Sequence, residues 1–229
     1  REGAAMLLAY TDQGTGPIVV LLHGFPLSRA MWAGQVGSLS TTHRVVAPDL
    51  RGHGESPAPD GVYTMDQMAD DVAELLDRLG VVEPVVLGGL SMGGYVAQAF
   101  ALKYPRRLRG LILTDTRAAA DTPEAARLRE ETAQRVLREG RITTVVETMI
   151  PRLFARSTLR NRPGLVSAMQ EEMERTPTSG VVGALRGMAI RPDRREQLRE
   201  IAAPALVVVG EEDVISPPEE ARAMAEALP

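Results

Sequence analysis

Five short apolar runs, separated by longer amphipathic stretches, constrain the fold of this chain more than any other feature. The runs fall at residues 18–22, 45–47, 85–87, 111–113 and 205–209. Their apolar residues are nearly consecutive, which is typical of parallel strands that are buried on both faces. An earlier segment, residues 6–10, fits a more exposed strand at the edge of the same sheet.

The stretches between the apolar runs show the spacing of amphipathic helices. Thr64 is placed to cap a helix over residues 65–79, and Gly80 ends it. Residues 91–104 and 217–228 predict two more helices, the last with proline at its start and acidic residues in its first turn. Because strands and helices alternate, the pattern predicts a doubly wound, mostly parallel sheet of the α/β class.

Residues 117–195 break this alternation. They contain no convincing strand, and apolar residues recur at helical spacing among arginines and glutamates, as in residues 124–139 and 165–174. We expect a helical insertion into one core domain formed by residues 1–116 and 196–229. The insertion is either a surface appendage or a lid over the carboxyl ends of the strands. We favour the lid, because ligands bind at those ends in such sheets.

The composition argues against several classes of function. The 229 residues carry a net charge of −4, which gives no electrostatic reason to expect nucleic acid or an anionic membrane as a partner. No run approaches the roughly 20 apolar residues of a membrane span. The absence of cysteine excludes thiolate nucleophiles, thiolate metal sites and disulfides. We expect a cytoplasmic protein that acts on a small molecule without a metal or an organic cofactor.

The strongest functional signal is Gly-Leu-Ser-Met-Gly-Gly at residues 89–94, between an apolar run and a predicted helix. This context is what a nucleophile elbow requires, since its strained turn needs small residues two positions before and after the serine. We therefore predict that Ser91 is a nucleophile. The alternative is a plain tight turn in which Ser91 only caps the helix.

His-Gly-Phe-Pro at residues 23–26 directly follows the first apolar run. A tetrahedral intermediate needs backbone N–H donors that point at its oxyanion. Met92, which follows the predicted nucleophile, is one expected donor, and Phe25 is the expected donor from this loop. We interpret His23 as a brace for the loop and not as a catalytic residue.

Two other loops follow apolar runs. Gly-Glu-Glu-Asp at residues 210–213 places Asp213 where a triad acid would orient an imidazolium. The alternatives are that Asp213 caps a helix or is merely solvated, and Asp115 is the other candidate acid. The glycine-rich loop at residues 49–56 is interpreted as structural, so His53 is not assigned to a triad.

Taken together, the chain resembles the α/β-hydrolase superfamily, in its branch of small bacterial carboxylesterases, 3-oxoadipate enol-lactonases and cofactor-free perhydrolases. The resemblance rests on residues 23–26, 49–56, 89–94 and 210–213 and covers nearly the whole chain apart from the insertion. It implies an α/β-hydrolase fold and hydrolysis of a carboxylic ester or lactone. Ser91 would form the acyl-enzyme.

The histidines depart from the family's pattern. The family's order along the chain is serine, acid and then histidine, whereas His23, His43 and His53 all precede Ser91. From the resemblance we expect that the chain is truncated at its C-terminus, lacks a last strand, the histidine loop and a last helix, and is inactive as it stands.

Two other functions stay open. A lyase like those of menaquinone biosynthesis resembles this chain in its Ser-Met-Gly-Gly elbow and would use arginines of the insertion to bind a multiply charged substrate. The candidates are Arg152, Arg156, Arg160, Arg162 and Arg186. A non-catalytic ligand-binding homologue would share the fold alone. A serine at the elbow argues against the related dehalogenases and epoxide hydrolases that use an aspartate nucleophile.

Overall fold

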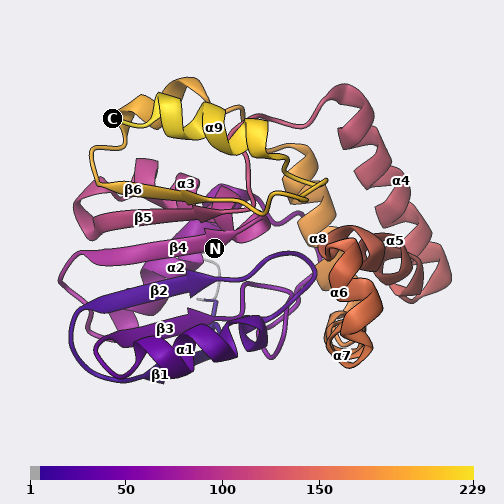
Figure 1. The fold of residues 1–229 in the computed structure, drawn as a ribbon, viewed down its shortest axis with the longest axis horizontal. Helices are drawn as coiled ribbons and strands as arrows, with labels where there is room; N and C mark the ends of the chain where they lie inside the picture. Colours follow the sequence, from indigo (N-terminus) through magenta and orange to yellow (C-terminus); the bar gives the residue numbers. More distant parts are fainter. Residues whose placement is uncertain (1–5) are drawn as a thin grey trace.

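The structure, a computed structural model, describes residues 6–229. Its centre is a six-stranded sheet in the order β1-β3-β2-β4-β5-β6 (Figure 1). The strands are β1 (Tyr10–Gln13), β2 (Ile18–Leu22), β3 (Arg44–Pro48), β4 (Val85–Leu90), β5 (Leu108–Thr114) and β6 (Ala205–Val208). Only the β1–β3 pair is antiparallel among the strands described. The predicted α/β class with a mostly parallel sheet is therefore confirmed.

The edge strand lies further along the chain than the sequence predicted. The prediction was residues 6–10, whereas β1 begins at Tyr10. Ala9, just before it, contacts the loop after β3, because its N–H donates to Ser56 Oγ and its carbonyl accepts from the amide of Asp49. Three of the four residues of β1 are exposed, so the strand has no apolar pattern by which it could be found.

Helices cover both faces of the sheet (Figure 1). α2 (Met65–Arg78) and α3 (Met92–Lys103) share the larger core cluster with one face, and α1 (Ala33–Leu39) packs on the other. Alternate residues of β2 supply the two clusters, since Val20 belongs to the first and Val19 to the second. Within residues 6–229, no helix combines the length and the apolar character needed to cross a membrane.

Five α-helices, a short 3-10 helix at Glu196–Glu200 and no strand lie between β5 and β6. The α-helices are α4 (Pro123–Glu139), α5 (Thr143–Leu153), α6 (Arg156–Asn161), α7 (Pro163–Glu174) and α8 (Thr178–Ala189). They gather at one end of the sheet, and α9 (Pro218–Ala227) follows β6 (Figure 1). We call residues 117–195 the helical insertion. The periodic pattern located α4 and most of α7, but it did not resolve α8, most of whose residues are buried.

The last helix of the insertion is held against the core. A Cβ atom at Gly180 would overlap the carbonyl of Gly52, so α8 approaches the loop after β3 through bare backbone. The amide of Tyr63 donates to the carbonyl of Gly183 at 3.0 Å, and Ser179 Oγ donates to the carbonyl of Ala58 at 3.1 Å. α8 is therefore held against the loop between β3 and α2.

Candidate active site

Ser91 occupies a sharp turn between β4 and α3. Its φ of 52° and ψ of −112° lie in a region that L residues rarely adopt, at a cost on the order of 1–3 kcal/mol. A Cβ atom at Gly89 would overlap the carbonyl of Gly93, and a Cβ atom at Gly93 would overlap the carbonyl of Leu22. The turn therefore needs both glycines. The structure has the strand–turn–helix context of the prediction, with the helix beginning at Met92.

The backbone of Ser91 is held while its hydroxyl stays free. The Ser91 amide donates to the carbonyl of Thr114 at 2.9 Å, and Thr116 Oγ1 donates to the Ser91 carbonyl at 2.8 Å. The Ser91 side chain makes no capping hydrogen bond to α3. Since capping was the alternative role for this serine, the geometry favours a hydroxyl that is kept available for chemistry.

The loop after β2 runs beside Ser91. A Cβ atom at Gly24 would lie 3.6 Å from the Cβ atom of Ser91. The N–H of Phe25, the next residue, has no hydrogen-bond acceptor among residues 6–229. Met92 is the first residue of α3, so its N–H has no acceptor within the helix. Both expected oxyanion donors are therefore available close to the serine.

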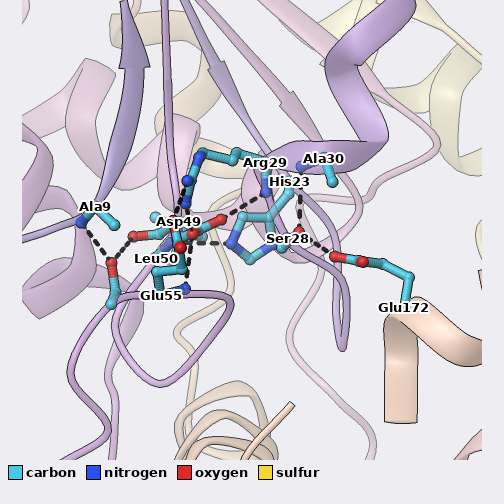
Figure 2. Close-up of polar contacts among 10 residues, drawn as sticks. Ala9, His23, Ser28, Arg29, Ala30, Asp49, Leu50, Glu55 and Glu172 are labelled. Carbon is cyan, nitrogen blue, oxygen red and sulfur yellow. Dashed lines mark hydrogen bonds and ion pairs between the residues drawn. The ribbon is translucent and has the colours of Figure 1, made fainter. Parts of the chain in front are cut away.

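His23 braces this loop from the core side, and Figure 2 shows its ring bonded to Leu50. Its Nε2 accepts from the amide of Leu50 at 2.9 Å, so the proton is on Nδ1, which donates to the carbonyl of Gly24 at 2.9 Å. The ring is fully buried, and burial lowers its pKa to about 4. At neutral pH His23 is thus an uncharged structural group with both nitrogens occupied.

The loop at residues 49–56 also has a structural role. Asp49 is fully buried and accepts from the Arg29 amide at 2.7 Å, from the Arg29 guanidinium and from the Glu55 amide at 2.9 Å (Figure 2). His53 is buried beside His23, and burial together with that neighbour lowers the pKa of His53 to about 3. Neither His23 nor His53 lines the cavity that contains Ser91.

That cavity has a volume of about 490 Å³ and lies between the core and the helical insertion. The core contributes Ser91, its neighbour Leu90 and residues of the loops after β2, β5 and β6. The insertion contributes Arg152, Leu153, Phe154, Ala155 and Met169. Ser91 therefore opens into a space of the size that binds small molecules.

Both candidate acids reach this cavity. Asp213 Oδ1 accepts from the amides of Ile215 at 2.7 Å and Ser216 at 2.9 Å, so one carboxylate oxygen anchors the turn before α9. Asp115 has a φ of 45°, and its Oδ1 accepts from the amide of Gly210 at 2.9 Å. Burial raises the pKa of Asp115, and the charge of nearby Asp213 acts in the same direction. The geometry brings the two carboxylates together and leaves the choice between them open.

The charged residues of the cavity bear on the lyase alternative. Of the five candidate arginines, only Arg152 lines the cavity, and Arg186 is paired with Glu130 on α4. Four acidic residues line it as well, namely Asp115, Glu211, Glu212 and Asp213. No histidine is among the residues of 6–229 that line it. Four carboxylates and a single arginine around Ser91 disfavour a multiply anionic substrate, so the charges of the cavity argue against the lyase alternative.

The residues that sequence reasoning missed come mainly from the insertion. Leu153, Phe154 and Met169 wall the cavity, and Thr176 donates from Oγ1 to the carbonyl of Pro26 in the loop beside Ser91. The hydrogen bond between Thr176 and Pro26 joins residues 150 positions apart, so no local sequence pattern predicts it.

Comparison with known proteins identifies a fold that this chain shares with its relatives. A family model described as the alpha/beta hydrolase fold matches residues 17–229. The curated 3-oxoadipate enol-lactonase 2 of Acinetobacter baylyi is 27% identical over 215 residues, covering 94% of this chain and 78% of the relative. A thermophilic esterase from Thermogutta terrifontis matches with a TM-score of 0.96 and 51% identity, over 100% of this chain and 84% of the esterase. An enol-lactonase from Burkholderia xenovorans gives a TM-score of 0.90 and 30% identity, over 98% and 86% of the two chains.

Proposed function

The chain belongs to the α/β-hydrolase fold family, and we propose that it is a serine hydrolase that cleaves a carboxylic ester or lactone through an acyl-enzyme on Ser91. The observation that carries the proposal is the strained turn of Ser91. The Ser91 hydroxyl makes no capping hydrogen bond to α3, and Ser91 lines the cavity of about 490 Å³. The similarity to an esterase and to enol-lactonases supports the substrate class.

In this reaction Ser91 Oγ attacks the carbonyl carbon, a base takes its proton, and the carbonyl oxygen becomes an oxyanion. The amides of Met92 and Phe25 donate to that oxyanion. The intermediate collapses with loss of the alcohol, which takes the proton back, and water then hydrolyses the acyl-enzyme by the same route. Asp213 orients the imidazole that serves as the base, with Asp115 as the alternative acid.

The base is the part of the triad that residues 6–229 do not bring to Ser91. His23 and His53 are buried away from the cavity, and His43 precedes β3, whereas the cavity lies at the opposite, carboxyl ends of the strands. We therefore propose that the 229 residues bind the substrate and orient Ser91, and that imidazole added in solution restores proton transfer.

Hydrolysis of p-nitrophenyl acetate and of a small lactone, with and without imidazole, tests this function. We expect little or no turnover by the 229-residue chain alone, acceleration by imidazole beyond the rate of imidazole alone, and loss of the protein-dependent part in Ser91→Ala. Loss of a catalytic serine or its base typically costs on the order of 10⁶ in kcat. A Ser91→Ala variant that keeps the protein-dependent rate would contradict the proposal. A protein that binds the ester tightly but shows no such rate would favour the ligand-binding homologue.

A further inference from the structure

We propose that Thr176, in the turn between α7 and α8, positions the Phe25 N–H through a chain of hydrogen bonds, so that the helical insertion sets the geometry of the oxyanion hole. The proposal rests on the proposed function, because it takes Phe25 as an oxyanion donor. Thr176 is a positioning residue, since it acts through the loop and does not touch the substrate.

The first step of the chain joins the insertion to the loop. Thr176 is only 5% exposed, and its Oγ1 donates to the carbonyl of Pro26 at 2.8 Å. Its own amide donates to the carbonyl of Met173 at 3.0 Å, which fixes the turn after α7. Leaving a buried carbonyl without its hydrogen-bond donor costs free energy. The hydrogen bond from Thr176 therefore holds the Pro26 carbonyl in one orientation.

The next steps follow from the planarity of the peptide bond. The carbonyl of Pro26 and the N–H of Leu27 belong to one trans peptide unit and point in opposite directions. That N–H donates to the carbonyl of Gly24 at 2.9 Å. The carbonyl of Gly24 shares a trans peptide unit with the N–H of Phe25. The hydroxyl of Thr176 therefore constrains and polarises the Phe25 N–H through two peptide units.

Two other contacts complete the arrangement. On the core side, Nδ1 of His23 donates to the same Gly24 carbonyl, so this carbonyl receives one bond from the core and one that leads to the insertion. On the insertion side, the hydroxyl of Ser28 donates to Glu172 on α7 (Figure 2). α7 also carries Met169, a wall of the cavity. α7, which lines the cavity of Ser91, is thus hydrogen-bonded to the loop after β2 that carries Phe25.

Phosphonylation of the full 229-residue chain by an alkyl fluorophosphonate in imidazole buffer tests the proposal. In this step the Ser91 Oγ–P bond forms, the P–F bond breaks, fluoride leaves and the serine proton passes to imidazole. The phosphoryl oxygen occupies the oxyanion hole. Removing one oxyanion donor costs about 10²–10³ in rate. Thr176 acts on the Phe25 N–H only through two peptide units, so its loss should cost less than loss of a donor. We expect Thr176→Val to lower the limiting rate of phosphonylation about tenfold and to leave the half-saturating concentration of the fluorophosphonate unchanged. Thr176→Ser should restore the limiting rate.

Thr148→Val is the control for the change from threonine to valine itself. Thr148 lies on α5, and its hydroxyl donates to the carbonyl of Thr144 at 2.7 Å within the same helix, so its loss should leave the rate unchanged. Hydrogen exchange gives a second readout that needs no chemistry. Thr176→Val should speed exchange of the Leu27 amide and leave the strands of the sheet protected.

The outcomes separate the two proposals. A wild-type chain that is never labelled at Ser91 overturns the proposed function and this inference with it. A labelled wild-type chain whose rate and Leu27 exchange are both unaffected by Thr176→Val overturns the inference alone. Slower labelling accompanied by faster exchange throughout the sheet would also overturn it, since that result means general destabilisation.

Discussion

Ser91 and the glycines around it show how a single turn can be both strained and obligatory. The positive φ of Ser91 is maintained by hydrogen bonds to its backbone, and the chain segments that cross here leave no space for a side chain at residues 89 and 93. The elbow was predictable from the sequence because its signature, small residues two positions before and after a serine between a strand and a helix, lies within a few residues. The contacts with Leu22 and Thr114 that also hold the turn come from other strands and were not predictable in that way.

Replacing Gly93 by alanine tests this interpretation of the turn. The added Cβ would overlap the backbone carbonyls of Leu22 and His23, which cannot move without disturbing β2. We expect a loss of stability of more than about 2 kcal/mol in urea unfolding. Gly37→Ala is the control, because Gly37 lies in α1 and a Cβ atom there would meet no other atom within 4 Å. Alanine at this helical position should stabilise by up to about 1 kcal/mol. Similar losses in both variants would contradict the interpretation.

Asp213 and Asp115 can be told apart by their effect on imidazole-dependent ester hydrolysis. Asp213 should orient the added imidazole, so Asp213→Asn should lower the imidazole-dependent rate by at least about tenfold, towards the loss of about 10⁴ seen for the corresponding change in a complete triad. Asp115→Asn should have a smaller effect. If Asp115→Asn abolishes the imidazole-dependent rate while Asp213→Asn keeps it, Asp115 is the triad acid.

At the scale of helices and strands, the sequence predicted best those elements whose residues are all buried. The central strands β2 and β3 are buried on both faces, and their continuous apolar runs located them closely. The run at residues 205–209 was expected to be buried in the same way, but three of the four residues of β6 are exposed, because β6 lies at the edge of the sheet that residues 6–229 form. The exposed strand β1 was placed too early, and the six-residue helix α6 is too short to show a period. In these elements tertiary contacts, and not local pattern, decide the structure.

The loops after β2 and β3 make stability depend on pH. His23 and His53 have pKa values of about 4 and 3 in the folded chain, against an ordinary value of 6.5. Between pH 6.5 and 4 the unfolded state therefore binds more protons than the folded state. Stability should be fully present above pH 6.5 and fall as the pH drops, by up to about 1.4 kcal/mol per pH unit for each histidine.

Urea unfolding between pH 7 and 5 measures this dependence. His53→Asn keeps a donor for the Arg51 carbonyl, to which the His53 ring is bonded at 3.0 Å, but removes one titrating group. The variant should be less stable overall and show a shallower slope than the wild-type protein. A wild-type stability that stays flat from pH 6.5 to 5 would mean that these rings take up protons in the folded state without penalty.

At the scale of the whole molecule, the site belongs to two parts of the chain that are distant in sequence. The core supplies Ser91, the acids and the loop of Phe25, and the helical insertion supplies the remaining walls and the hydroxyl of Thr176. Sequence motifs predicted the candidate residues of the core because each follows a strand, and the structure places Ser91, Asp115 and Asp213 on one cavity. The walls could not be identified in that way, since they depend on how α5 and α7 pack over the sheet.

Peptide mapping by mass spectrometry after fluorophosphonate treatment in imidazole buffer tests the assignment of Ser91 most directly. We predict one adduct per chain on Ser91, no adduct in Ser91→Ala, and protection of Ser91 by excess ester. Labelling of another residue at the same rate, or an equal yield of adduct in Ser91→Ala, would contradict the assignment.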